Sequence, residues 1–62
     1  MENNMRNDIV EAIEEATILE CALDRFDERH IMYVAHRLSN APLSSVEKVY
    51  YERKKVVDLI CV

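Results

Sequence analysis

Residues 9–26 read IVEAIEEATILECALDRF, and this stretch decides the fold of the chain. Apolar side chains recur in it at spacings of three and four, which is the repeat of an amphipathic α-helix. Asn7 or Asp8 is suited to cap the start of this helix, because a short polar side chain can accept hydrogen bonds from the first free amides. The sequence therefore predicts a helix over about 8–26.

This first helix is apolar on more than one side. One arc contains Ile9, Ala12, Ile13, Ala16, Leu19, Leu23 and Phe26, and a second group off that arc contains Val10, Ile18, Cys21 and Ala22. A helix that is apolar on several sides has to be covered on several sides, and a chain of 62 residues has few other elements to cover it. We therefore expect a homodimer, and the residues expected in its contact or in the core are Ile9, Ile13, Ala16, Ile18, Leu19, Leu23 and Phe26.

Two more helices follow the first one. Asp27 is a second capping residue, and a short apolar stripe follows it over about 28–39. Pro42 breaks this pattern, because the residue before a proline is disfavoured in helical geometry. Ser44 then opens a capping-box sequence, and a further apolar stripe extends over about 45–60.

The expected architecture is all-α. Three short helices, at about 8–26, 28–39 and 45–60, form a helical bundle that homodimerisation completes. A β fold of this size would need glycine in its tight turns, and the chain contains no glycine. We expect a single domain over residues 1–62, of which residues 1–6 form a frayed tail.

The sequence also carries signals about the cellular setting. Its beginning is polar and unlike a signal peptide, and no apolar run approaches the roughly 18 residues of a membrane span. These patterns predict a cytoplasmic protein. Because the cytoplasm is reducing, Cys21 and Cys61 are expected to be small buried apolar side chains.

Charge is distributed unevenly along the chain, whose formal net charge is −4. Residues 1–28 contain nine acidic and two basic side chains, whereas residues 29–62 contain six basic and three acidic ones. The two halves can attract each other in the folded chain, or one half can meet a charged partner. We favour the first interpretation, because basic residues interleaved with acids make a poor surface for following phosphates.

Three charged residues interrupt the apolar pattern. Arg53 falls within the stripe of the third predicted helix, and Glu20 and Asp24 interrupt or border the arc of the first. Arg53 can lie along the edge of the core with its guanidinium in water. Alternatively, it forms an ion pair with Glu20 or Asp24, within a chain or across a dimer, and sets the register of the helices. Both interpretations stay open at this point.

The sequence shows no pattern typical of a metal site, a cofactor site or a catalytic centre. His30 and His36 are six residues apart and do not share a helix face, and the two cysteines make no CxxC spacing. The serines fall in connections and caps, and a chain without glycine has no glycine-rich phosphate loop. We therefore expect no metal, no cofactor, no small-molecule substrate and no enzymatic activity.

The expected mode of action is protein binding. Candidate contacts are the acidic side chains of the first helix and an exposed tyrosine among cations in the third, namely Glu11, Glu14, Glu15, Tyr51, Lys54 and Lys55. Small acidic regulators and inhibitors, phage-encoded ones among them, often have this composition. The sequence suggests a regulatory protein that binds a target protein through its helix faces and inhibits it.

The alternative is a helix-turn-helix transcriptional regulator that binds DNA. The second and third helices have a suitable order for this motif, and base contacts would then fall to Ser45, Lys48, Tyr51 and Glu52. Against this alternative, the connection from Ser39 to Leu43 is longer than the usual three or four residues. The chain is also acidic, whereas DNA-binding domains are normally basic.

Overall fold

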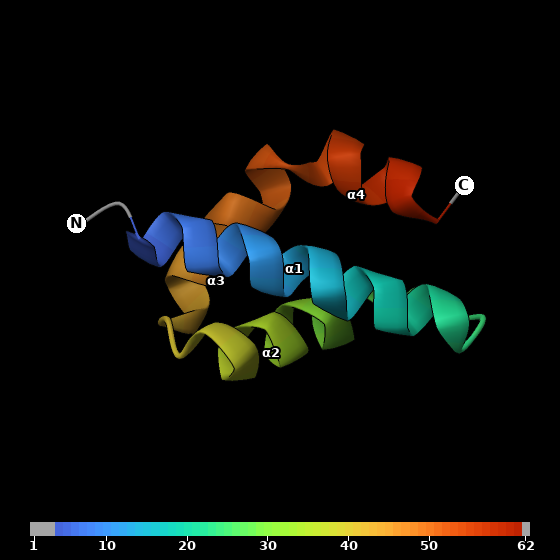
Figure 1. The fold of residues 1–62 in the computed structure, drawn as a ribbon, viewed down its shortest axis with the longest axis horizontal. Coiled ribbons are helices and arrows are strands. Elements are labelled where there is room, and N and C mark those ends of the chain that lie inside the picture. Colours follow the sequence, from blue (N-terminus) through green and yellow to red (C-terminus); the bar gives the residue numbers. More distant parts are fainter. Residues whose placement is uncertain (1–3, 62) are drawn as a thin grey trace.

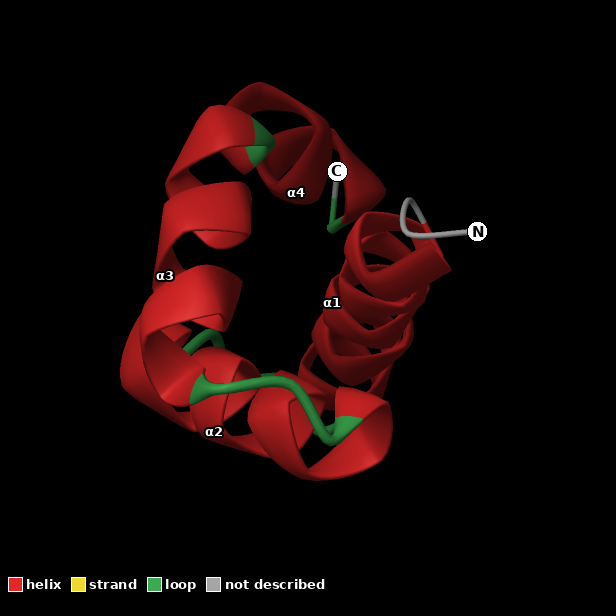
Figure 2. Cartoon of the chain, turned by 90° about the vertical axis from the view of Figure 1, so that its left-hand side faces the viewer, coloured by secondary structure: helices red, strands yellow, loops and turns green. Residues whose placement is uncertain are grey.

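The computed structural model describes residues 4–61, and this part of the chain is all-helical. Its four helices are α1 (Asn4–Ala22), α2 (Glu28–Ser39), α3 (Leu43–Glu52) and α4 (Lys54–Ile60). α2 runs antiparallel beside α1, α3 leads away from the end of α2, and α4 returns along α1 (Figure 1). Seen along the long axis of the molecule, the four helices enclose a common core (Figure 2).

α1 begins earlier and ends earlier than the predicted 8–26. Its first turn contains Met5 and Arg6, so the frayed tail predicted over residues 1–6 does not extend to these two residues, and residues 1–3 lie outside the described part. The Arg6 Nη1 atom lies 2.6 Å from Glu52 Oε1 on α3, which holds the beginning of α1 in place. The expected caps at positions 7 and 8 are therefore wrong, since both residues lie inside the helix.

The end of α1 is set by Asp24, whose φ of 60° is left-handed. The Arg25 amide donates to the Glu20 carbonyl at 3.1 Å, and the Asp24 amide donates to the Cys21 carbonyl at 3.0 Å. This pair of bonds is the Schellman arrangement, which usually has glycine at the left-handed position. The chain turns away before Phe26, so the predicted helix end at that residue is too late.

α2 occupies the predicted range of 28–39. Asp27 caps it as expected, and its carboxylate accepts hydrogen bonds from the amides of Arg29 and His30 at 3.1 and 3.3 Å. Asn40 ends the helix in a left-handed conformation with φ of 61° and donates its amide to the His36 carbonyl at 3.0 Å. Local signals therefore decide both ends of this helix.

The predicted third helix over 45–60 is two helices. It begins at Leu43 rather than after Ser44, and no side chain caps it, so the capping-box prediction is wrong. It is interrupted at Arg53, which adopts φ of −107° and ψ of 20°. The interruption turns α4 toward α1 and places Val57 in the core with an exposed fraction of 1%. Tertiary packing, rather than local sequence, accounts for the break.

The core lies between the four helices and is built from α1 outward. The buried apolar side chains are Ile9, Ala12, Ile13, Ala16, Ile31, Met32, Ala35, Ala41, Val46, Val49, Tyr50 and Val57. Four residues expected in the core or in a dimer contact are exposed instead, with fractions of 56%, 53%, 62% and 42% for Ile18, Leu19, Leu23 and Phe26. These four therefore do not fill the core of a single chain, because α2 and α4 cover only one side of α1.

Cys21 and Cys61 form a disulfide, with their Cα atoms 5.7 Å apart. The bond joins the last turn of α1 to the residue after α4, forty positions further along the chain. The expectation of two separate buried thiols is therefore wrong. The break at Arg53 explains the pairing, because a straight helix over 45–60 would carry Cys61 away from α1.

Candidate functional site

Five acidic side chains within residues 4–61 are paired with a cation of the same chain. Arg53 Nη2 lies 2.9 Å from Glu14 Oε2, so the predicted pairing of Arg53 with Glu20 or Asp24 is wrong. The break before α4 presents Arg53 to the middle of α1 rather than to its end. Asp24 takes part in the turn after α1 and in no ion pair within residues 4–61.

Glu20 is a buried carboxylate with an exposed fraction of 2%. Its Oε2 atom lies 2.6 Å from His30 Nδ1 on α2, and its Oε1 atom lies 3.4 Å from Arg25 Nε. Buried carboxylates are stable only with such partners. Glu20 therefore joins α1 to α2 at the end where the chain turns, which is a structural role.

A second cluster fastens the beginning of α4. Lys54 Nζ lies 2.5 Å from Glu28 Oε2 and 3.3 Å from Asp58 Oδ1, and 6.0 Å from the centre of the Phe26 ring. Its hydrogen bond to Glu28 raises the pKa of Lys54 above its ordinary value. The neighbouring Tyr50 is fully buried, and this burial, together with the negative charge of Glu28, raises the pKa of Tyr50 to about 12.

Three acidic side chains on one side of α1 are left without a cation. We call Asp8, Glu11 and Glu15 the acidic flank; within residues 4–61 none of the three takes part in an ion pair. They are spaced three and four residues apart, so their side chains are neighbours on the helix. Like charges at this spacing destabilise a helix slightly. Within residues 4–61, no cation pairs with the acidic flank to offset this repulsion.

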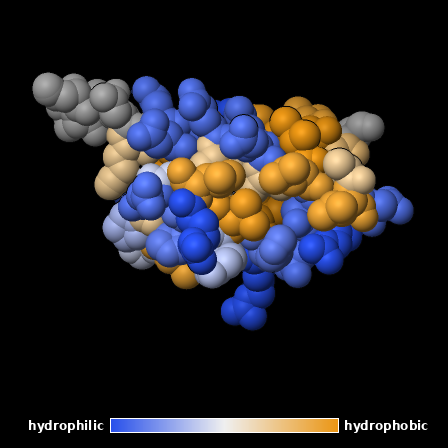
Figure 3. Space-filling model, turned by 60° about the horizontal axis from the view of Figure 1, so that its bottom comes forward, coloured by the Kyte–Doolittle hydropathy of each residue, from blue (hydrophilic) through white to orange (hydrophobic). Residues whose placement is uncertain are grey.

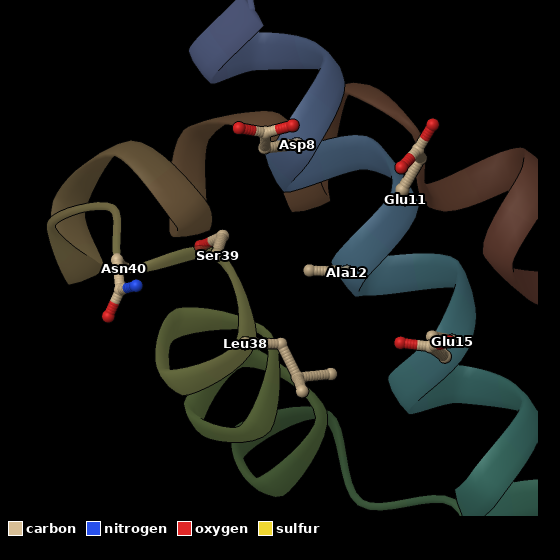
Figure 4. A pocket seen from close by; sticks show the side chains of 7 residues that line it. All are labelled: Asp8, Glu11, Ala12, Glu15, Leu38, Ser39 and Asn40. Atoms are coloured by element: carbon tan, nitrogen blue, oxygen red, sulfur yellow. The ribbon is translucent and has the colours of Figure 1, made fainter.

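The acidic flank borders an open hollow of about 400 Å³ between α1 and α2. The hollow is lined by Asp8, Glu11, Ala12 and Glu15 from α1 and by Leu38, Ser39 and Asn40 from the end of α2. Figure 4 shows Ala12, Glu15 and Leu38 facing the space between the two helices. The hollow is therefore acidic and mainly polar, and Ala12 and Leu38 are its apolar lining residues. Within residues 4–61, no group of three potential ligands is arranged to hold a metal ion.

An apolar surface continues from the hollow along the same side of the α1–α2 pair. Leu19 follows Glu15 on α1 by four residues, and Leu23 follows Leu19 by four in the turn directly after the helix. Val34 precedes Leu38 by one turn on the antiparallel α2. We call Leu19, Leu23, Val34 and Leu38 the apolar strip. The three leucines are exposed by 53%, 62% and 50%, and Val34 is half-buried. Figure 3 shows apolar side chains spread over this face between hydrophilic margins.

The predicted partner contacts fall on separate surfaces. Glu11 and Glu15 meet at the hollow, whereas Glu14 is engaged by Arg53. Lys54 is held by Glu28. Lys55 and Tyr51 are exposed, and the Tyr51 ring stands edge-on to Tyr50 with 5.4 Å between ring centres.

Sequence reasoning missed Asp8 and Leu38 as parts of the site. Asp8 was expected to cap α1 and Leu38 was expected in the stripe that α2 turns inward. The signal that could have identified Asp8 is the series Asp8, Ala12, Glu15 and Leu19, which follows one line on α1 at helical spacing.

Both histidines make structural contacts. His30 binds Glu20, and His36 Nδ1 lies 2.6 Å from the Ala41 carbonyl oxygen, which fixes the connection between α2 and α3. Within residues 4–61, none of the helices combines the length and the apolar character needed to cross a membrane. The chain matches no protein-family model, no curated protein and no solved structure. Inferences about its function therefore depend on its own geometry.

Proposed function

We propose that the chain is a small non-enzymatic regulatory protein that binds another protein through the face formed by α1 and α2 and inhibits it. The observation that carries this proposal is the combination of the acidic flank with the apolar strip on one side of the molecule. Contiguous exposed apolar surface on a small protein commonly marks an interaction site. The leucines of the apolar strip are exposed, and the acidic flank makes no ion pair within residues 4–61, so both are available to contact a partner.

Binding is favoured over catalysis by the arrangement of the polar groups. The carboxylates of the acidic flank are spread along a helix at an open surface, whereas acid–base chemistry needs groups that converge on one reacting atom. Glu20 is buried against His30, and its carboxylate is held in a contact between α1 and α2. Inhibition would follow from occupying a surface that the target needs for its own activity.

Homodimerisation stays part of the proposal. In this structure Ile18 lies on the side of α1 opposite its buried arc, and Phe26 lies in the turn that follows α1; both are exposed. A second copy meeting these side chains would leave the apolar strip accessible. Light scattering at micromolar concentration tests this, and a mass near that of one chain, 7.3 kDa, would refute the dimer.

A specific observation keeps DNA binding as the second candidate function. α2 ends at Ser39 and α3 begins at Leu43, so the connection has the three residues typical of a helix-turn-helix unit, and the argument from a longer connection is wrong. The left-handed Asn40 supplies the turn. Against this function, the exposed side of α3 presents Lys48 between Glu47 and Glu52, which is a poor surface for phosphates.

One pair of measurements separates the two functions. The full chain and its Leu19→Gln/Leu23→Gln variant are immobilised, and proteins of the native host are captured on each and identified by mass spectrometry. We expect a protein that the wild type retains and the variant loses. Retention of the chain on a DNA duplex at low salt, with strong salt dependence and no effect of the variant, would contradict protein binding and support the second candidate.

A further inference from the structure

We propose that the partner contributes a basic amphipathic helix, which docks along the surface formed by the acidic flank, the hollow and the apolar strip; we call this surface the groove. Its apolar side chains would cover the apolar strip, and lysine or arginine side chains at one end would meet the acidic flank. This inference rests on the proposed function and specifies the class of partner. It also fixes the orientation, because the acidic flank lies beside the end of α2 and the exposed leucines of α1 lie toward the turn after α1.

The length of the surface suits a helix of about four turns. Asp8 on α1 and Leu23, directly after its end, are fifteen positions apart, which corresponds to about 22 Å at the rise of an α-helix. A partner helix packed along this line would use apolar residues at helical spacing, as in other complexes where a helix lies in a groove. About fifteen residues of the partner would span this line, and those on one face of its helix would make the contact.

The charge of the groove selects a basic partner. Glu14, Glu28 and Glu52 each have a cation of the same chain within 3 Å. The acidic flank has none within residues 4–61, and its three carboxylates repel one another. A cationic segment would remove this repulsion, whereas an acidic one would add to it. Asp24, Asp27 and Glu47 also lack an ion pair within residues 4–61, but they lie away from the hollow, whereas the three carboxylates of the acidic flank line it.

The hollow offers a place for a long basic side chain. Leu38 is half exposed and can lie against its methylene stem, and Glu15 and Asp8 lie at the rim within reach of its charged head. Lysine and arginine commonly bury their stems while the charge stays near water or an acid. The lining of the hollow is mainly polar, so its carboxylates are the main attraction for such a side chain.

The test is a selection from a displayed library of helical peptides of eighteen residues, randomised over apolar, acidic, basic and amide side chains. The bait is the full chain with its disulfide intact. We expect the selected peptides to share an apolar stripe and to carry lysine or arginine at one end of it. Their affinity, measured by fluorescence anisotropy, should fall about tenfold or more with Glu15→Lys and with Leu19→Gln.

The matched control is Glu47→Lys. Glu47 is exposed on α3 and takes part in no ion pair within residues 4–61, so this variant makes the same charge change away from the groove. Circular dichroism checks that each variant keeps its helices. An equal loss of affinity with Glu47→Lys and Glu15→Lys would show that only the net charge of the chain matters. That result would overturn the proposal that the peptide docks in the groove.

Other results also overturn the proposal. Selected peptides without a basic end, or no selected peptide at all, would rule out this class of partner. Peptides that bind but depend on Tyr51 rather than on Glu15 would leave the protein-binding function standing and move its site. A dimer in sedimentation that Leu19→Gln dissociates would assign the groove to a second copy of the chain.

Discussion

The disulfide between Cys21 and Cys61 should supply a large part of the stability of the fold. It closes a loop of forty residues, and the chain-entropy relation gives about 4 kcal/mol at 25 °C for a loop of this length. α4 contains one buried side chain, Val57, so noncovalent packing of this helix replaces little of that constraint. We expect the Cys21→Ser/Cys61→Ser variant to lose most of this free energy of unfolding.

The size of the chain makes the effect easy to measure. An unfolding entropy of about 2.1 cal/mol/K per residue amounts to about 130 cal/mol/K for 62 residues. A loss of about 4 kcal/mol would therefore lower the melting temperature by about 30 °C. Thermal and urea unfolding followed by circular dichroism would give both quantities for the wild type and the serine variant.

Two controls make this experiment decisive. A dithiol reductant should move the wild type to the melting temperature of the serine variant and should leave that variant unchanged. Hydrogen exchange in the reduced wild type should accelerate first in α4, since its remaining attachments are the Arg53–Glu14 pair, the Lys54–Glu28 pair and Val57. A loss below about 1 kcal/mol, or uniform acceleration over all helices, would refute the reasoning from loop closure.

Three further predictions concern single side chains. Asp24→Gly should raise the free energy of unfolding by up to about 1 kcal/mol in urea, because Asp24 is left-handed and glycine takes this conformation without steric penalty; a destabilised variant would contradict the assigned turn. Arg53→Met should lower it by less than about 1 kcal/mol, since the pair with Glu14 is partly exposed, and a double-mutant cycle with Glu14→Gln should isolate that value; a coupling well above it would assign the pair a larger role. Tyr50→Phe should make the fold more resistant to alkali: the pKa of Tyr50 is raised from 10.0 to about 12 on folding, so stability present below pH 10 is lost as the pH rises toward 12. An unchanged alkaline unfolding midpoint in this last variant would contradict the burial of the phenol.

The part of the fold that could be predicted is the part decided by local signals. Both boundaries of α2 agree with the prediction, because Asp27 caps its beginning and Pro42 follows its end. The break at Arg53 has no glycine or proline to announce it, and the sequence there is compatible with a continuous helix. It is explained by packing between residues distant in sequence, namely the pair of Arg53 with Glu14 and the burial of Val57.

The candidate site shows the same division. Glu11 and Glu15 could be recognised from sequence because they share an exposed side of a helix. Which acids stay without a cation could not be predicted, since the partner of Glu14 is thirty-nine positions away. Leu38 contributes to the site because of how α2 lies against α1, and a helical repeat alone does not specify that placement.

The sequence does not predict the disulfide between the two cysteines, and this bond bears on the expected location of the protein. A separation of forty residues carries no pairing signal in sequence. Disulfides persist in oxidising compartments and are uncommon in the cytoplasm. The cytoplasmic location therefore stays a prediction, which the oxidation state of Cys21 and Cys61 in the native host would test.

The same disulfide divides the chain into a covalent ring and a tail. α2, α3 and α4 all lie within the ring from Cys21 to Cys61, whereas almost all of α1, with the acidic flank and Leu19, lies outside it. A protease that cuts once at the basic run after the break, Arg53 to Lys55, would open the ring without releasing a fragment. The surface on α1 that we propose for binding would then stay covalently attached to every other helix after such a cut.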